Sequence, residues 1–159
     1  MALPTRLLVV CLGNYCRSPM AEAILRHRVA AAGVRGSVEV ASAGTRPFRI
    51  GGPPHSEVLA ILQARGIDAR GLSGRAVAAE DVDRYNRILA ADRHVLRQLE
   101  ALPFGGARLE LLLPYGGSGG LDVPDPFAVG GFEEVYELLD QACRGLLDDV
   151  LAERARFGR

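Results

Sequence analysis

The sequence predicts an α/β fold, a doubly wound sheet of four parallel strands with helices on both faces. Short apolar runs alternate with segments of helical periodicity along the chain, which is the pattern of strands and crossover helices in a parallel sheet. The chain has 159 residues, of which 48% are hydrophobic, and this is enough to build a buried core. We expect a single domain over residues 1–159.

The first half of the chain contains two strand patterns and two helix patterns. Residues 6–11 (RLLVVC) form a continuous apolar run, which is typical of a strand buried on both faces. A helix is predicted over about 18–33, with a proline in its first turn and a glycine as its stop. Residues 38–44 (VEVASAG) predict the second strand, and 56–66 predict a helix with Ser56 as its cap.

The second half continues the alternation of strands and helices. Residues 87–92 predict the third strand, 93–102 a helix, and 107–113 the fourth strand. A loop rich in glycine and proline, 114–131, leads into a long amphipathic helix over 132–154.

The carboxyl ends of parallel strands meet at one edge of a sheet, and ligands of such folds bind there. Cys11, the turn at Gly44, Asp92 and the loop after the fourth strand all fall at that edge. The functional site is therefore predicted among these segments.

The charge balance and the cysteine content exclude several classes of function. Nineteen basic residues, all arginine, balance 19 acidic residues, which argues against a nucleic-acid or membrane partner held by charge. The N-terminal apolar run is too short for a signal peptide, and no later run approaches the length of a membrane span. The three cysteines form neither a disulfide framework nor a zinc motif. We expect a cytoplasmic protein without a metal or another cofactor.

The segment CLGNYCRS connects the first strand to the first helix. The bare C-x5-R spacing has little specificity, but a strand, a short loop and a helix start aim backbone N–H groups at an anion. Gly13 and Asn14 most readily take the positive φ that such a nest needs. The amides, the helix dipole and Arg17 would favour the thiolate form of Cys11.

These residue types suit phosphoryl transfer without a metal. Arg17 offers a planar fork for two phosphate oxygens, and the Ser18 hydroxyl can hydrogen-bond the Cys11 sulfur as it leaves. The Gly-Lys-[Ser/Thr] ending of nucleotide-hydrolysing loops is absent. The residues expected around the phosphate are Leu12, Gly13, Asn14, Tyr15, Cys16 and Ser18.

CLGNYCRSPMAE closely resembles the active-site loop of the low-molecular-weight protein-tyrosine phosphatases. The resemblance covers nearly the whole chain, with further matches at SAGT (42–45), the Gly51–Pro53 turn, RGI (65–67), Asp92 and DPF (125–127). It implies a four-stranded parallel fold and hydrolysis of phosphotyrosine in proteins through a cysteinyl-phosphate intermediate. Cys11 would be the nucleophile and Arg17 the phosphate clamp.

The same chemistry needs an acid for the leaving group and a base for water. Asp122 and Asp125 in GLDVPDPF are the candidates, and the residues alone do not separate them because Asp before Pro is common in turns. The resemblance selects Asp125. Pro126 would hold Asp125 extended, and Phe127 would line the pocket.

Further site residues are implied by the resemblance. Asn14 and Ser42 would hold the loop open, with Asp92 in a supporting place. Leu72 stands where the family commonly has a histidine, so we expect altered support for the loop. Phe48-Arg49 replaces the usual Trp-His; Phe48 would line the entrance, and Arg49 is either a solvated charge or a contact for acidic peptides.

Tyr15 and Cys16 concern the substrate and its regulation. Relatives selective for phosphoarginine carry Thr at the place of Tyr15, and the bulky ring argues for phosphotyrosine. Cys16 is expected to capture an oxidised Cys11 as a disulfide.

The expected partner is a phosphotyrosine protein such as a bacterial tyrosine kinase. Two rival functions are an arsenate reductase of the same fold and a non-catalytic phosphopeptide-binding module.

Overall fold

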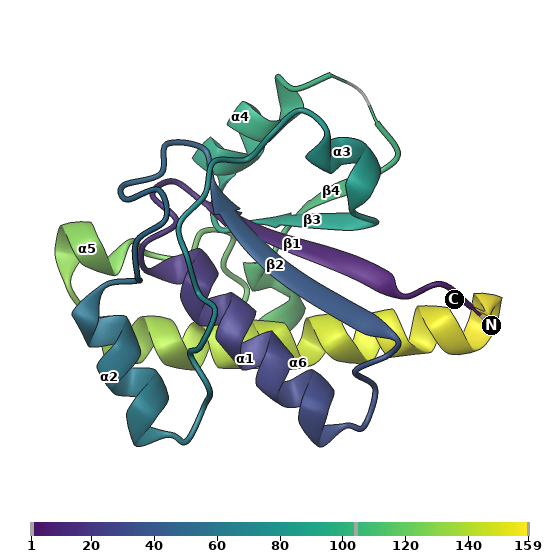
Figure 1. Cartoon of the computed structure of the whole chain (residues 1–159), viewed down its shortest axis with the longest axis horizontal. Coiled ribbons are helices and arrows are strands. Elements are labelled where there is room, and N and C mark those ends of the chain that lie inside the picture. The colour runs from purple at the N-terminus through teal and green to yellow at the C-terminus, as the bar shows by residue number, and fades with distance from the viewer. Residues whose placement is uncertain (1, 104, 159) are drawn as a thin grey trace.

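The centre of the computed structural model, which describes residues 2–103 and 105–158, is a parallel sheet of four strands in the order β2-β1-β3-β4 (Figure 1). The strands are β1 (Thr5–Cys11), β2 (Val38–Gly44), β3 (Arg87–Ala90) and β4 (Arg108–Leu111). Every neighbouring pair runs parallel. The predicted fold class is therefore confirmed.

Helices cover both faces of this sheet. On one face lie α1 (Arg17–Ala31), α2 (Ser56–Ala64) and α6 (Phe132–Phe157), and on the other lie α3 (Asp81–Arg84) and α4 (Arg93–Glu100) (Figure 1). Alternate residues of β1 point to opposite faces, so Leu7 packs in the core under α1 and α6 while Leu8 packs in the core under α4. The run of apolar residues in β1 reflects this burial on both sides.

Several predicted boundaries differ from the structure. The first helix begins one residue earlier and ends at Ala31, because the chain reverses at Gly33 with φ of 72°. The predicted Ser56 cap was wrong: His55 is the N-cap, and its Nδ1 accepts a hydrogen bond from Glu57 N at 3.0 Å. The helix predicted to residue 66 ends at Ala64.

The later elements also differ in length, and the structure adds three short helices. The strands predicted to residues 92 and 113 end at Ala90 and Leu111, and the helix predicted to residue 102 ends at Glu100. The last helix continues to Phe157. The short α3, the 3₁₀ helix η1 (Leu113–Gly116) and α5 (Pro126–Val129) have four residues each, which is too short to produce a recognisable periodicity.

The carboxyl ends of β1 and β3 form the point where the chain connections diverge to opposite sides of the sheet. Cys11 ends β1 beside Gly44 of β2. Asp92 follows β3 and caps α4, with its Oδ1 accepting from Val95 N at 2.8 Å. Val123 N donates to Ala91 O at 2.8 Å and so brings the loop before α5 to the same place.

Within the described ranges, no helix is long and apolar enough to cross a membrane.

Candidate active site

The loop between β1 and α1 wraps around the sulfur of Cys11. Asn14 N donates to Cys11 Sγ at 3.2 Å, and Ser18 Oγ lies 2.9 Å from the same sulfur. Of the two residues expected to have positive φ, Asn14 has it, at 48°, and Gly13 does not. The left-handed backbone at Asn14 turns its N–H back toward the end of β1, as an anion nest requires.

Buried hydrogen bonds hold the side chain of Asn14. Its Nδ2 donates to Ser18 Oγ at 2.8 Å and to Ser42 Oγ at 3.1 Å, and its Oδ1 accepts from Arg75 N at 2.9 Å. Ser42 Oγ donates in turn to Glu22 Oε1 at 2.6 Å. Since a non-glycine residue in this conformation is costly, this network stabilises the shape of the loop.

Sequence reasoning missed Glu22. The residue is buried on α1, and this burial raises its pKa. The Ser42 hydrogen bond and Arg26, whose Nη2 lies 2.5 Å from Glu22 Oε2, oppose the shift without cancelling it. The first nine residues of α1 are all buried, so helical periodicity does not single out one of them.

Leu72 lies in the apolar core. The Asn14 side-chain oxygen accepts a hydrogen bond from the backbone N–H of Arg75, and not from a side chain at position 72.

Arg17 lies buried at the start of α1 and joins three segments. Its Nη1 donates to Asp92 Oδ2 at 2.7 Å and to Val123 O at 2.8 Å, and its Nη2 lies 3.9 Å from Asp125 Oδ2. Burial alone would lower the pKa of Arg17, but Cys11, Asp92 and Asp125 outweigh it, and the pKa is raised. The guanidinium therefore keeps its charge in the site.

The two candidate acids lie in different surroundings. Asp125 caps α5, accepts from Phe127 N at 3.1 Å and lines the cavity above Arg17. Asp122 instead pairs with Arg93 on α4 at 2.9 Å, and that hydrogen bond lowers the pKa of Asp122. The structure thus places Asp125, and not Asp122, beside Arg17.

A cavity of about 170 Å³ opens over Cys11. Three aromatic rings surround its mouth: Tyr15 lies 4.8 Å from Phe48 and 5.8 Å from Phe127, and Phe48 lies 5.5 Å from Phe127, measured between ring centroids. The cavity is lined by Cys11, Leu12, Gly13, Tyr15, Cys16, Arg17, Arg46, Phe48, Asp125 and Phe127. At these separations the three rings contact one another, and the buried Arg17 is a charged group among the residues that line the cavity beneath them.

Arg46 and Gly44 show why the segment after β2 belongs to the site. A Cβ at position 44 would lie 2.8 Å from Leu12 O and 2.9 Å from Asn14 N, so only glycine allows this close approach of β2 to the loop. The sequence identified the Gly44 turn but missed Arg46, because in a chain whose basic residues are all arginine nothing distinguishes one of them.

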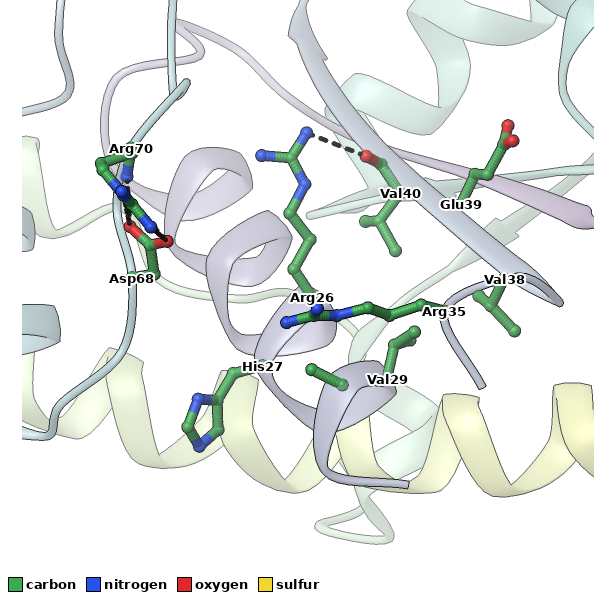
Figure 2. A pocket seen from close by; sticks show the side chains of 10 residues that line it. Arg26, His27, Val29, Arg35, Val38, Glu39, Val40, Asp68 and Arg70 are labelled. Carbon is green, nitrogen blue, oxygen red and sulfur yellow. Dashed lines mark hydrogen bonds and ion pairs between the residues drawn. The ribbon is translucent and has the colours of Figure 1, made fainter. Parts of the chain in front are cut away.

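A larger cavity, of about 440 Å³, lies elsewhere, between α1, β2 and the segment around Asp68 (Figure 2). Two of its arginines have partners nearby: Arg70 Nη2 pairs with Asp68 Oδ2 at 2.9 Å, and Arg26 Nη2 donates to Val40 O at 3.2 Å. The described residues that line it include no cysteine. Its size alone does not make it the reaction site.

The chain is similar in sequence to known phosphatases. The family model for low molecular weight phosphotyrosine protein phosphatases matches residues 6–156. The low molecular weight protein-tyrosine-phosphatase YfkJ of Bacillus subtilis is 39% identical over 150 residues, which cover 92% of this chain and 96% of that protein. The phosphatase PtpA of Staphylococcus aureus (strain Newman) is 34% identical over 145 residues, covering 91% and 92%.

The chain is also similar in fold to solved structures. The crystal structure of YfkJ from Bacillus subtilis has a TM-score of 0.92 at 38% identity and covers 96% of this chain and 98% of that chain. The structure of DARP, described as a Drosophila arginine phosphatase, has a TM-score of 0.82 at 32% identity and covers 90% and 96%.

Proposed function

The chain belongs to the low molecular weight phosphotyrosine protein phosphatase family, and from that premise we propose that it hydrolyses phosphotyrosine in proteins through a cysteinyl-phosphate intermediate. One observation carries the proposal. Cys11, Arg17 and Asp125 line the same small cavity although they come from different segments. A nucleophile, an anion clamp and an acid are the groups that this reaction requires.

In the first step the Cys11 thiolate attacks phosphorus, and the bond to the tyrosine oxygen breaks. Asp125 gives its proton to the leaving phenolate. Because Arg17 Nη1 is already bound to Asp92 and Val123, we expect the other N–H groups of its guanidinium to bind the phosphate oxygens, together with the loop amides.

In the second step water attacks the phosphorus of phosphocysteine. Asp125, now ionised, accepts a proton from that water, and the Cys11 thiolate leaves. The Ser18 hydroxyl and the Asn14 N–H, both at the sulfur, stabilise the negative charge of the leaving thiolate. The enzyme returns to its starting state with phosphate as the second product.

The aromatic mouth supports an aryl substrate. The Tyr15, Phe48 and Phe127 rings offer edge and face contacts to a phenol ring. Phosphoarginine is the competing substrate, because one solved relative is described as an arginine phosphatase. Peptides that differ only in phosphotyrosine or phosphoarginine separate the two substrates, and we expect kcat/KM to favour phosphotyrosine.

The arsenate reductase and the phosphopeptide-binding module each meet a specific obstacle. An arsenate reductase needs further cysteines to pass electrons, and Cys143 is fully buried under α1 with its pKa raised by that burial. A non-catalytic phosphopeptide module would not need an acid beside the clamp. We propose that the enzyme works in the cytoplasm on a phosphotyrosine protein, with a bacterial tyrosine kinase as the first substrate to test.

Asp125→Asn tests the acid. We expect the variant to hydrolyse phosphotyrosine about 10²- to 10³-fold more slowly, because an uncatalysed proton transfer to a poor leaving group costs about that much. The kcat/KM for nitrophenyl phosphate should fall far less, because this ratio reports the first step, in which the nitrophenolate leaving group needs no proton. Asp122→Asn is the matched control and should retain nearly full activity on both substrates. If the two variants exchange these behaviours, Asp122 is the acid.

Cys16 is proposed as a redox partner of Cys11. Cys11 and Cys16 line the same cavity, and burial raises the pKa of Cys16 to about 12, helped by the charges of Asp125 and Cys11. Peroxide would convert the Cys11 thiolate to a sulfenic acid, which removes the Cys11 charge. Attack by the Cys16 sulfur would then form a disulfide and release water.

Reversibility of peroxide inactivation tests this role. Dithiothreitol should restore most activity to the wild type and little to Cys16→Ser, in which Cys11 proceeds to irreversible states. Because the Cys16 thiolate is the attacking species and burial keeps the Cys16 pKa raised, trapping should accelerate as the pH rises. Equal recovery of both proteins would leave Cys16 as an apolar filler.

A further inference from the structure

Residues 45–52, which follow β2, form one wall of the active-site mouth. They are hydrogen-bonded to the loop between β1 and α1, which is the proposed phosphate-binding loop. Arg46 N donates to Leu12 O at 2.8 Å, and Phe48 N donates to Gly13 O at 2.8 Å. The position of this wall is therefore set by the same loop that would bind the phosphate.

The end of this wall around Gly51 and Gly52 is held by backbone hydrogen bonds to Gly74. Gly51 N donates to Gly74 O at 2.8 Å, and Gly74 N donates to Gly52 O at 3.0 Å. A Cβ on Gly74 would overlap the carbonyl oxygen of Arg49, so the two backbones are in direct contact. The backbone that carries Arg49 is held in place and does not depend on the substrate for its position.

Two exposed arginines stand on this wall. Arg46 lines the cavity, and the Arg49 guanidinium carbon lies 5.6 Å from the Phe48 ring centroid and 5.9 Å from that of Tyr15. In the described part of the chain, neither arginine forms an ion pair with a carboxylate.

The opposite wall carries little competing charge. Among the described residues that line the cavity, Asp125 is the one carboxylate, and its Oδ2 already lies 3.9 Å from Arg17 Nη2. The rest of that wall is the exposed side chain of Phe127, followed by exposed Val129 on α5. The mouth therefore has a basic side and an apolar side.

We propose that Arg46 and Arg49 make the enzyme selective for phosphotyrosine segments with Asp or Glu next to the phosphotyrosine. The inference rests on the proposed function and adds its substrate class. An extended chain advances about 3.3 Å per residue, so residues flanking a phosphotyrosine seated over Cys11 pass over this wall. Carboxylates there would pair with arginines that have no carboxylate partner among the described residues of the free enzyme.

The expected effect is moderate because these pairs are exposed. An exposed ion pair changes affinity by up to about fivefold, and its attraction is screened by salt. We expect kcat/KM for a peptide flanked by Glu to exceed that for the same peptide flanked by Lys by about tenfold in dilute buffer. The ratio should approach one near 1 M salt, where the screening length is about 3 Å.

The experiment uses three phosphotyrosine peptides that differ only in Glu, Ala or Lys flanks. The readout is the ratio of their kcat/KM values on one protein, so a general loss of activity cancels. Arg46→Glu and Arg49→Glu should each lower or invert the Glu-to-Lys ratio. Arg35→Glu makes the same charge change at an exposed arginine of the distant cavity (Figure 2) and should leave the ratio at the wild-type value.

The outcomes separate this inference from the proposed function. A wild type that hydrolyses all three peptides at equal rates, or Arg46 and Arg49 variants that keep the wild-type ratio, would overturn the inference alone. A ratio that also falls in Arg35→Glu would show an effect of net charge and would overturn it too. A wild type that hydrolyses none of the peptides would overturn the proposed function.

Discussion

Cys11→Ser is expected to lower turnover on the order of 10⁴-fold or more while the protein still folds and binds vanadate. Loss of an enzyme's nucleophile has effects of this size, because a serine hydroxyl is not ionised near neutral pH, and Asp125, which donates a proton in the first step, cannot also act as the base for it. The hydroxyl can still accept from Asn14 N and pair with Ser18, which bind the sulfur in the wild type. The shape of the loop should therefore survive.

The measurements for Cys11→Ser are the release of phosphate from nitrophenyl phosphate, the Kd for vanadate and the midpoint of thermal unfolding. Cys143→Ala is the matched control, because it removes a buried thiol that lies in the core and outside the cavity. That variant should lose some stability and keep its activity per folded molecule. If Cys11→Ser keeps more than a few per cent of wild-type turnover, another group is the nucleophile.

The fold could be predicted because its signals are local. The strand β1 is a short apolar run, and the long helix α6 shows periodic burial and has Gly158 as its C-cap. The wrong prediction of the cap of α2 also has a local cause. Ser56 is a good cap by type, but the His55 ring nitrogen accepts from Glu57 N and takes that place.

The site could be predicted only where its residues carry a motif. Cys11, Asn14, Arg17 and Ser18 lie in one loop, and their contacts follow from the turn that connects β1 to α1. Glu22 carries no such signal, because it reaches Asn14 only through Ser42 on another element.

The choice between the two acids shows the same limit. Asp122 and Asp125 have similar local sequence, and the ion pair of Asp122 with Arg93 depends on the position of α4 beside the loop. The position of α4 is set by tertiary packing. A residue pattern can nominate both carboxylates, but the packing of the neighbouring helix decides which one faces Arg17.

Arg17→Lys is the second large effect, with turnover expected to fall on the order of 10²- to 10³-fold, which is the loss seen when a transition-state charge partner is removed. In the wild type Nη1 binds both Asp92 and Val123 O, while the rest of the fork remains for phosphate. A lysine ammonium is a single point and cannot reproduce both sets of contacts. The binding of vanadate should therefore weaken together with turnover.

The stability of Arg17→Lys must be measured as well, because a poorly paired Asp92 at the end of β3 would also destabilise the fold. Arg87→Lys is the matched control: Arg87 is as buried as Arg17 and pairs with Glu110 and Asp149, but it does not line the active-site cavity. Both variants should lower the free energy of unfolding by about 1–3 kcal/mol, as a weakened buried hydrogen-bonded charge does. Arg17→Lys alone should lose vanadate affinity and activity per folded molecule. If Arg87→Lys loses both equally, or if Arg17→Lys keeps both, then Arg17 stabilises the fold and does not bind the phosphate.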